Sequence, residues 1–125
     1  MRSVQIGGRP LEPIELARRV VDIVEDKLGE DILLLDIREL CPFADFFVIC
    51  SGASERQLKA LVRGVRETVK AELGLLPYHV EGETFSGWVL LDYEDVIVHV
   101  FSPDKRAYYD LEGLWQEGKL LVRMQ

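Results

Sequence analysis

The stretch SGWVLLDYEDVIVHVF, residues 86–101, decides the fold. It contains two short apolar runs, residues 88–91 and 96–101, and three acidic residues lie between them. Short runs rich in Val, Ile and aromatic residues, separated by a polar turn, are typical of a β-hairpin. The sequence therefore predicts two strands joined by an acidic turn, with aromatic side chains nearby.

The first strand of this hairpin is predicted to present a mixed aromatic and acidic face. Side chains alternate between the two faces of a strand, so Trp88, Leu90 and Asp92 share one face. Tyr93 belongs to the other face, with the remaining apolar residues of the strand. Because Asp92 and Tyr93 stand next to the turn, we expect both to be available to a partner.

Acidic charge is concentrated around the hairpin. Between Lys70 and Lys105 the chain has seven acidic residues and neither Lys nor Arg, so this stretch accounts for the whole net charge of −7. A one-sided acidic field attracts cations and repels phosphate backbones. The charge pattern therefore favours a basic protein surface as the partner and argues against nucleic acid as the main one.

Upstream of the hairpin, hydrophobic spacing predicts a helix followed by two strands. Pro13 suits the first turn of a helix, whose apolar residues recur at helical spacing as far as Leu28, and Gly29 is expected to end it. Continuous apolar runs at 32–37 and 46–50 predict strands that are covered on both faces.

A second helix and three further segments complete the prediction. Ser54 and Gln57 form a capping-box pattern at the start of the helix, and Gly74 is expected to end it. Residues 78–81 are predicted to form a short strand that precedes the hairpin, and residues 104–115 a helical end.

These segments predict an α/β fold with one domain. The order α-β-β-α-β-β-β-α indicates a sandwich of two or three layers, in which flanking helices cover a mixed five-stranded sheet. The single domain is expected over residues 13–117, between a flexible arm at 1–12 and a loose tail at 118–125. A chain of 125 residues is long enough to bury such a core without disulfides or metals.

Composition narrows the cellular context. No apolar run is long enough to span a membrane, and the amino terminus has no apolar core of a signal peptide, so a cytoplasmic protein is expected. Cys41 and Cys50 have no His or Cys nearby at metal-ligand spacing, and we interpret them as reduced, partly buried thiols rather than a redox pair.

An ordered series of motifs resembles the ribosomal silencing factor, or Iojap, family. The first motif is DFFVICSGAS, residues 45–54, followed by Arg56-Gln57. The later motifs, in order, are Gly74-Leu75-Leu76-Pro77, Glu81-Gly82, Trp88, Asp92, Asp95–Phe101 and Tyr109–Trp115. Each motif alone is weak, but the ordered set is specific and extends over nearly the whole predicted domain.

The resemblance implies a non-enzymatic regulator of translation. Family members bind the large ribosomal subunit on its face toward the small subunit, where they dock on the fourteenth large-subunit ribosomal protein. Occupying that surface blocks subunit joining and lowers protein synthesis when nutrients run short. The family fold is similar to that of nucleotidyltransferases, without their chemistry, and needs no cofactor.

The resemblance also implies a set of partner-binding residues. The positions of this chain that match the docking surface of the family are Trp88, Asp92, Tyr93, Asp95 and Tyr109. Aromatic residues are common interface anchors, although a lone Trp is as often a core residue. We favour contact over core for this group.

Two other classes of function stay open. One is an active nucleotidyltransferase, with Asp92, Glu94 and Asp95 as metal ligands and Ser51-Gly52 as a phosphate-binding turn. A nucleotidyltransferase would need an Asp-x-Asp pair on a strand soon after this turn, and the sequence has none there. No metal site or catalytic residue is therefore predicted. The other alternative is a generic acidic dimerisation module. An exposed apolar and acidic docking face also predicts that the free protein can form a homodimer in the absence of ribosomes.

The histidines and the basic residues have simpler interpretations. His99 is expected to be a buried sheet residue that is hydrogen-bonded to Tyr108 or a loop carbonyl, and His79 a loop residue. Neither has a Ser or Cys placed beside it as a nucleophile. The second helix carries a basic stripe, which is predicted to be a solvated face or to touch ribosomal RNA beside the main contact: Arg56, Lys59, Arg63, Arg66 and Lys70.

Overall fold

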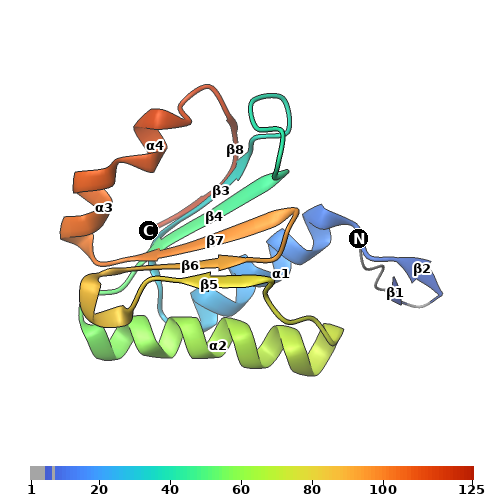
Figure 1. Cartoon of the computed structure of the whole chain (residues 1–125), viewed down its shortest axis with the longest axis horizontal. Helices are drawn as coiled ribbons and strands as arrows, with labels where there is room; N and C mark the ends of the chain where they lie inside the picture. The colour runs from blue at the N-terminus through green and yellow to red at the C-terminus, as the bar shows by residue number, and fades with distance from the viewer. Residues whose placement is uncertain (1–4, 7) are drawn as a thin grey trace.

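The computed structural model of the chain describes residues 5, 6 and 8–125, in which two layers of helices lie on either side of a main sheet, and β1 and β2 pair separately (Figure 1). The elements follow in this order: β1 (Gln5–Ile6), β2 (Arg9–Pro10), α1 (Pro13–Asp26), β3 (Glu30–Asp36), β4 (Phe46–Ser51), α2 (Glu55–Leu73), β5 (His79–Glu81), the 3-10 helix η1 (Thr84–Ser86), β6 (Trp88–Asp92), β7 (Val96–Phe101), α3 (Pro103–Tyr109), α4 (Leu111–Leu114) and β8 (Lys119–Met124).

The main sheet has six strands in the order β5-β6-β7-β4-β3-β8. The predicted mixed α/β sheet is confirmed, because β4 and β7 are parallel while the other neighbours are antiparallel. The predicted count of five strands is wrong. The residues assigned to a loose tail include β8, which pairs with β3 and covers an edge that would otherwise be open.

One face of the sheet is fully closed by α1 and α2. Every second residue of the central strands points into this closed face, and the buried cluster there is mostly aliphatic. In α2 the residues Leu61, Val65 and Val69 have no exposed surface. This is the largest continuous core of the domain, and its burial supplies most of the hydrophobic stabilisation.

The other face, called here the open face, is covered only in part by α3 and α4. Its buried cluster is smaller and contains Phe47, Ile97 and Phe101, with Trp88 and Trp115 packed partly buried against it. Figure 1 shows α3 and α4 leaning over one side of the sheet, while the strands beyond them lie uncovered by any helix.

The helix boundaries show which helix ends the local sequence patterns predicted correctly. Ser54 caps α2 by accepting from the Gln57 backbone N–H at 3.1 Å, as predicted. The capping box is not reciprocal, because the Gln57 side chain instead donates to the carbonyl of Lys27 at 2.7 Å and so ties α2 to the end of α1. Leu28, predicted on the buried face of α1, lies beyond its end and is 76% exposed.

The helical end predicted at 104–115 divides into α3 and α4. Asp110 separates them in the left-handed conformation, with φ of 47°. Its side chain accepts from the Gly113 backbone N–H at 3.1 Å, which starts the second short helix. At the other end of the chain, the predicted arm includes a small pairing of β1 with β2, and residues 1–4 and 7 lie outside the described part.

Two further expectations concern the cysteines and the membrane. Cys41 and Cys50 are free and buried, on the open and closed faces of the sheet respectively. Burial raises the pKa of Cys50 to about 12, so this thiol stays protonated at neutral pH. Within the described residues, every helix is too short or too polar to cross a bilayer.

Candidate docking surface

An aromatic cluster on the open face is centred on Trp88. Its ring stacks on Phe101 with centroids 5.0 Å apart, and on the other side it meets Tyr109 at 4.4 Å. Register explains the first contact, because Trp88 lies directly opposite Phe101 in the β6–β7 pair. Trp88 is therefore held between a core residue and an exposed one.

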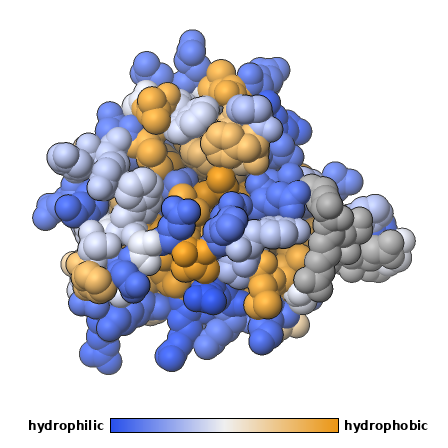
Figure 2. All heavy atoms as spheres, in the orientation of Figure 1, coloured by the Kyte–Doolittle hydropathy of each residue, from blue (hydrophilic) through white to orange (hydrophobic). Residues whose placement is uncertain are grey.

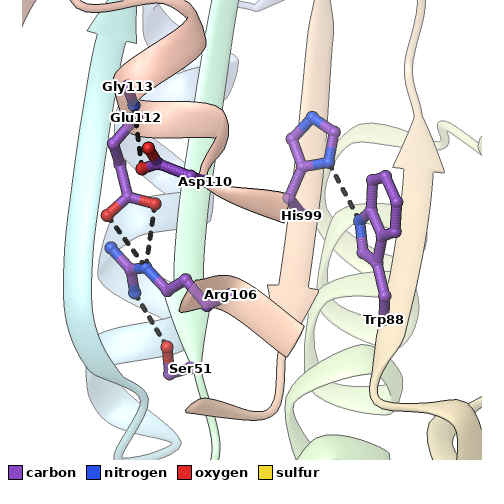
Figure 3. A network of polar contacts seen from close by, with 7 residues as sticks. All are labelled: Ser51, Trp88, His99, Arg106, Asp110, Glu112 and Gly113. Carbon is purple, nitrogen blue, oxygen red and sulfur yellow. Dashed lines mark hydrogen bonds and ion pairs between the residues drawn. The ribbon is translucent and has the colours of Figure 1, made fainter. Parts of the chain in front are cut away.

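His99 fixes the orientation of Trp88. The indole N–H of Trp88 donates to Nδ1 of His99 at 3.3 Å (Figure 3). Burial lowers the pKa of His99 to about 3, so the ring is neutral at physiological pH. Since Nδ1 accepts, the proton of the neutral ring lies on Nε2, a buried atom without a hydrogen-bond partner among the described residues. The predicted buried histidine is confirmed, but its partner is Trp88.

Arg106 fixes the position of α3 and α4 over the sheet. This buried guanidinium donates to Oγ of Ser51 at 2.8 Å and to both carboxylate oxygens of Glu112 at 3.2 Å (Figure 3). It thereby links the end of β4 to both short helices. Tyr109, the last residue of α3, is held over Trp88 by this link.

The approach of α3 to β6 also requires a glycine. Gly87 has a φ of +84°, and a Cβ there would lie 2.6 Å from Oγ of Ser102 and 2.7 Å from Cγ of Lys105. The Gly87 carbonyl accepts from the Ser102 backbone N–H at 2.8 Å. A side chain at Gly87 would therefore separate α3 from the strand that carries Trp88.

An acidic turn stands at the other end of β6. Oδ1 of Asp92 accepts from the Glu94 backbone N–H at 2.7 Å, and Glu94 has a positive φ of 78°. Partial burial, and then the neighbouring carboxylates of Asp45 and Glu94, raise the pKa of Asp95. The carboxylates of Asp45 and Glu94 lie close enough to Asp95 to act on it, so negative charge is concentrated at this turn.

The structure brings four of the five predicted partner-binding residues to one side of the sheet. Trp88 and Asp92 share the open face of β6, as the alternation predicted, with Leu90 between them. Tyr109 covers Trp88, and Asp95 belongs to the turn beyond Asp92. We call this set, with Leu90, the docking surface.

Tyr93 does not belong to it. The expectation that Tyr93 is available to a partner is wrong, because its side chain is only 6% exposed and packs in the core of the closed face. Burial raises its pKa to about 12, and its hydroxyl has no hydrogen-bond partner among the described residues. The position beside the turn suggested exposure, whereas alternation placed the ring under α1 and α2.

Sequence reasoning did not single out Tyr108, which lies next to the docking surface. Tyr108 is 77% exposed and meets the ring of Tyr109 edge-on at 5.0 Å. Figure 2 shows apolar side chains gathered in the middle of the face seen there, with polar ones around them. The sequence did contain a signal for an exposed aromatic pair, because Tyr108 and Tyr109 are adjacent at the end of a short helix that starts at Pro103.

The polar groups that the nucleotidyltransferase alternative would use are engaged in structural contacts. Within the described residues there is no group of three His, Cys, Asp or Glu side chains arranged to hold a metal ion. Ser51, part of the turn compared with nucleotidyltransferases, uses its hydroxyl to accept from Arg106. Asp92 is engaged with the turn backbone. What remains accessible is an aromatic anchor beside concentrated negative charge.

Comparisons with known proteins identify the relatives of this chain. The sequence profile of the family described as "Ribosomal silencing factor during starvation" matches residues 10–124. Ribosomal silencing factor RsfS of Halalkalibacterium halodurans is 43% identical over 104 residues, which make up 83% of this chain and 88% of that protein.

A solved structure and a mitochondrial relative extend the likeness. A crystal structure of a protein from Chromobacterium violaceum superposes with a TM-score of 0.80 at 35% identity, covering 92% of this chain and 94% of the other. The mouse protein named "Mitochondrial assembly of ribosomal large subunit protein 1" is 30% identical over 98 residues, covering 77% of this chain and 43% of the mouse protein.

Proposed function

We propose a function from one premise: the chain belongs to the ribosomal silencing factor family. On this premise the protein binds the free large ribosomal subunit and prevents the small subunit from joining it. Protein synthesis then falls when nutrients are limiting. The observation that carries the proposal is the family match over residues 10–124, which includes the whole docking surface.

The partner we propose on the large subunit is its fourteenth ribosomal protein. The docking surface offers what a basic protein partner needs, namely the half-buried ring of Trp88 beside the exposed ring of Tyr109, and an acidic turn at the end of β6. Tyr and Trp are enriched among the residues that dominate binding energy, and complementary charge raises the association rate. The name of the mouse relative refers to the large subunit, and it supports that particle as the partner without pointing to one protein on it.

Steric exclusion is the proposed mechanism. A bound protein that overlaps the contact between the subunits blocks their joining without any chemical step. The required property is affinity for the large subunit at cellular concentrations, together with rigid side chains at the point of contact. Trp88 satisfies the second requirement, because His99 and Phe101 hold its ring in place.

Subunit mixing tests the proposal directly. The purified protein is expected to cosediment with isolated large subunits and not with small ones. Added in excess before the subunits are mixed, it should reduce the light-scattering increase that reports whole ribosomes. An undiminished signal, with cosedimentation absent, would contradict the proposed function.

We also propose that the protein has a nucleotidyltransferase-like topology but is not an enzyme. Ser51 and Asp92 are engaged in structural hydrogen bonds at the positions that the alternative function needs. Calorimetry with nucleoside triphosphates and Mg²⁺ is expected to show no binding. Incorporation of labelled nucleotide into RNA, lost in Asp92→Ala, would support the alternative instead.

In the absence of ribosomes we propose a homodimer. The open face exposes apolar side chains, and such patches often mediate self-association through a two-fold axis. Sedimentation velocity should show a dimer that dissociates when large subunits are added. A monomer at all concentrations would remove this part of the proposal only.

A further inference from the structure

A groove runs along the solvent side of α2, away from the docking surface. Its cavity volume is about 740 Å³, and the loop residue Leu76 and Thr84 of η1 form the wall opposite the helix. In Figure 1, α2 lies along one edge of the molecule beneath β5 and η1. Since α2 covers the closed face of the sheet, the groove and Trp88 are on opposite sides of the sheet.

Basic side chains dominate the lining of the groove. Five cations follow one another at spacings of three and four residues, so they form a line on one side of the helix: Arg56, Lys59, Arg63, Arg66 and Lys70. Glu67 is the one acidic residue among those lining residues. At 1.5 Å per residue the line is about 21 Å long, enough to follow several consecutive phosphates.

Three of these cations are available to a ligand. Lys59 and Arg63 make ion pairs within the helix, at 3.3 and 3.5 Å, but the partners are mostly exposed, so these pairs hold the side chains weakly. Arg56, Arg66 and Lys70 have no ion pair with any residue that the structure describes. The positive charge of the groove is therefore largely uncompensated, although the chain as a whole is acidic.

The rest of the lining distinguishes between kinds of anionic ligand. Ala60, Val62 and Leu76 supply small and medium apolar contacts, and none of the described lining residues is aromatic. Single-stranded nucleic acids are bound through stacking of bases on aromatic rings, whereas double-helical RNA is recognised by shape and by its backbone. A cationic line without aromatic rings fits the second class of ligand.

We infer that the groove of α2 binds the phosphate backbone of double-helical RNA, without sequence preference. The inference rests on the proposed function, in which the protein works on a particle built largely of RNA. It assigns a second contact to the chain, one that depends on salt. The acidic stretch at residues 71–104 opposes the approach of phosphates, so the contact is expected to add to protein docking rather than replace it.

The test uses the isolated protein and a labelled RNA hairpin, with no ribosomal protein present. Anisotropy is measured between about 50 and 200 mM salt. The variant carries Arg56→Gln, Arg66→Gln and Lys70→Gln, because Gln is a good helix former and these side chains are exposed. A control with the same net charge carries Arg18→Gln, Lys119→Gln and Arg123→Gln, all exposed and away from the groove.

Wild type and control are expected to bind the hairpin alike, with affinity that falls steeply with salt. The groove variant should bind about tenfold more weakly or worse, with a salt slope reduced by about 3. Equal weakening by the control, tighter binding of single strands, or binding of polyglutamate in place of RNA would each overturn the inference. Because no ribosomal protein is in the assay, such a failure leaves the proposed docking on the large subunit untouched.

Discussion

The two faces of the sheet are built from the same strands but differ in the kind of side chain they carry and in how far those side chains are buried. The closed face, under α1 and α2, is aliphatic, and nearly all of its side chains are fully buried. The open face carries Trp88, His99 and Phe101 in one aromatic cluster, with Tyr109 44% exposed at its rim. Stability and recognition are thus assigned to opposite sides of one layer.

The two faces also differ in how they bury polar groups, since the buried hydroxyl of Tyr93 on the closed face has no hydrogen-bond partner among the described residues. On the open face, by contrast, two buried polar side chains are hydrogen-bonded. The neutral ring of His99 orients Trp88, and the guanidinium of Arg106 holds the short helices that carry Tyr109. Such groups cost desolvation energy, and a core built for stability alone would replace them with apolar side chains. Their presence indicates that the open face is held in a particular geometry.

The largest expected effect is a loss of stability on the closed face. Leu61→Ala removes a side chain with no exposed surface and should lower the free energy of unfolding by about 3 kcal/mol. Leu90→Ala, on the open face, is partly exposed and should cost less than half as much. Denaturant titration measures both. Equal losses of unfolding free energy in the two variants would contradict the assignment of stability mainly to the closed face.

The next effect concerns binding. Tyr109→Ala should weaken affinity for the large subunit by about 2 kcal/mol, or about thirtyfold, with little change in melting temperature. Phe85→Ala removes another exposed aromatic ring, in η1, where Phe85 is 74% exposed against 44% for Tyr109; it serves as the control and should bind normally. Wild-type affinity in Tyr109→Ala, measured by cosedimentation, would remove this ring from the docking surface.

Trp88 combines both roles, and two variants separate them. Trp88→Ala should lower both affinity and stability, because the ring stacks on Phe101. Trp88→Phe keeps much of the stacking but removes the N–H that donates to His99. If the hydrogen bond orients the anchor, Trp88→Phe should still lose affinity while melting close to the wild type. Full affinity in this variant would show that ring area alone matters.

The pH dependence of stability tests the burial of His99. Its pKa is about 3 in the fold and about 6.5 when unfolded, so below pH 6.5 only the unfolded chain takes up the proton. Stability should therefore fall as the pH falls, by about 2 kcal/mol between pH 7 and pH 5. His99→Gln removes this contribution, and the difference between the two proteins isolates it from the carboxylates. Parallel stability curves would contradict the neutral buried ring.

The smallest effects are expected at Asp95, where a substitution should raise stability but slow binding. The pKa of Asp95 is raised in the fold, so its charge costs stability at neutral pH, and Asp95→Asn should melt slightly higher. The same change should slow association with a basic partner, and Asp95→Lys should slow it further and weaken its salt dependence. Stopped-flow association rates give the measurement. Unchanged rates in both variants would exclude the turn from docking.

Local patterns predicted more of the closed face than of the open one. The apolar spacing of α1 and α2 and the alternation along β6 predicted which of their residues are buried, because burial there follows directly from periodicity. The exposed strand β8 was missed, since its identity depends on the open edge of β3, more than eighty positions away. Such long-range pairing leaves little trace in a single sequence.

The candidate site shows the same limit. Trp88 and Tyr109 were predicted from residue type and family likeness, but neither source indicated that they touch each other. The hydrogen bond from Trp88 to His99 depends on the register of two strands, which places Leu90 opposite His99 and so makes Trp88 its diagonal neighbour. Tyr93 was assigned wrongly because its place in the chain outweighed its place on the strand.

The parallel pairing of β4 with β7 has a consequence for the order of folding. Partners across this seam, such as Phe46 and Val96, are 50 positions apart, whereas the flanking pairs β3–β4 and β6–β7 are hairpin neighbours. Closing a long loop before its contacts form makes such a seam slow. We therefore expect the hairpins β3–β4 and β6–β7 to assemble before they join along β4 and β7, while β8, whose partners on β3 are more than eighty positions away, pairs later still. Before the hairpins join, β4 and β7 present unpaired edges, and the newly made chain is most prone to pair with a wrong partner.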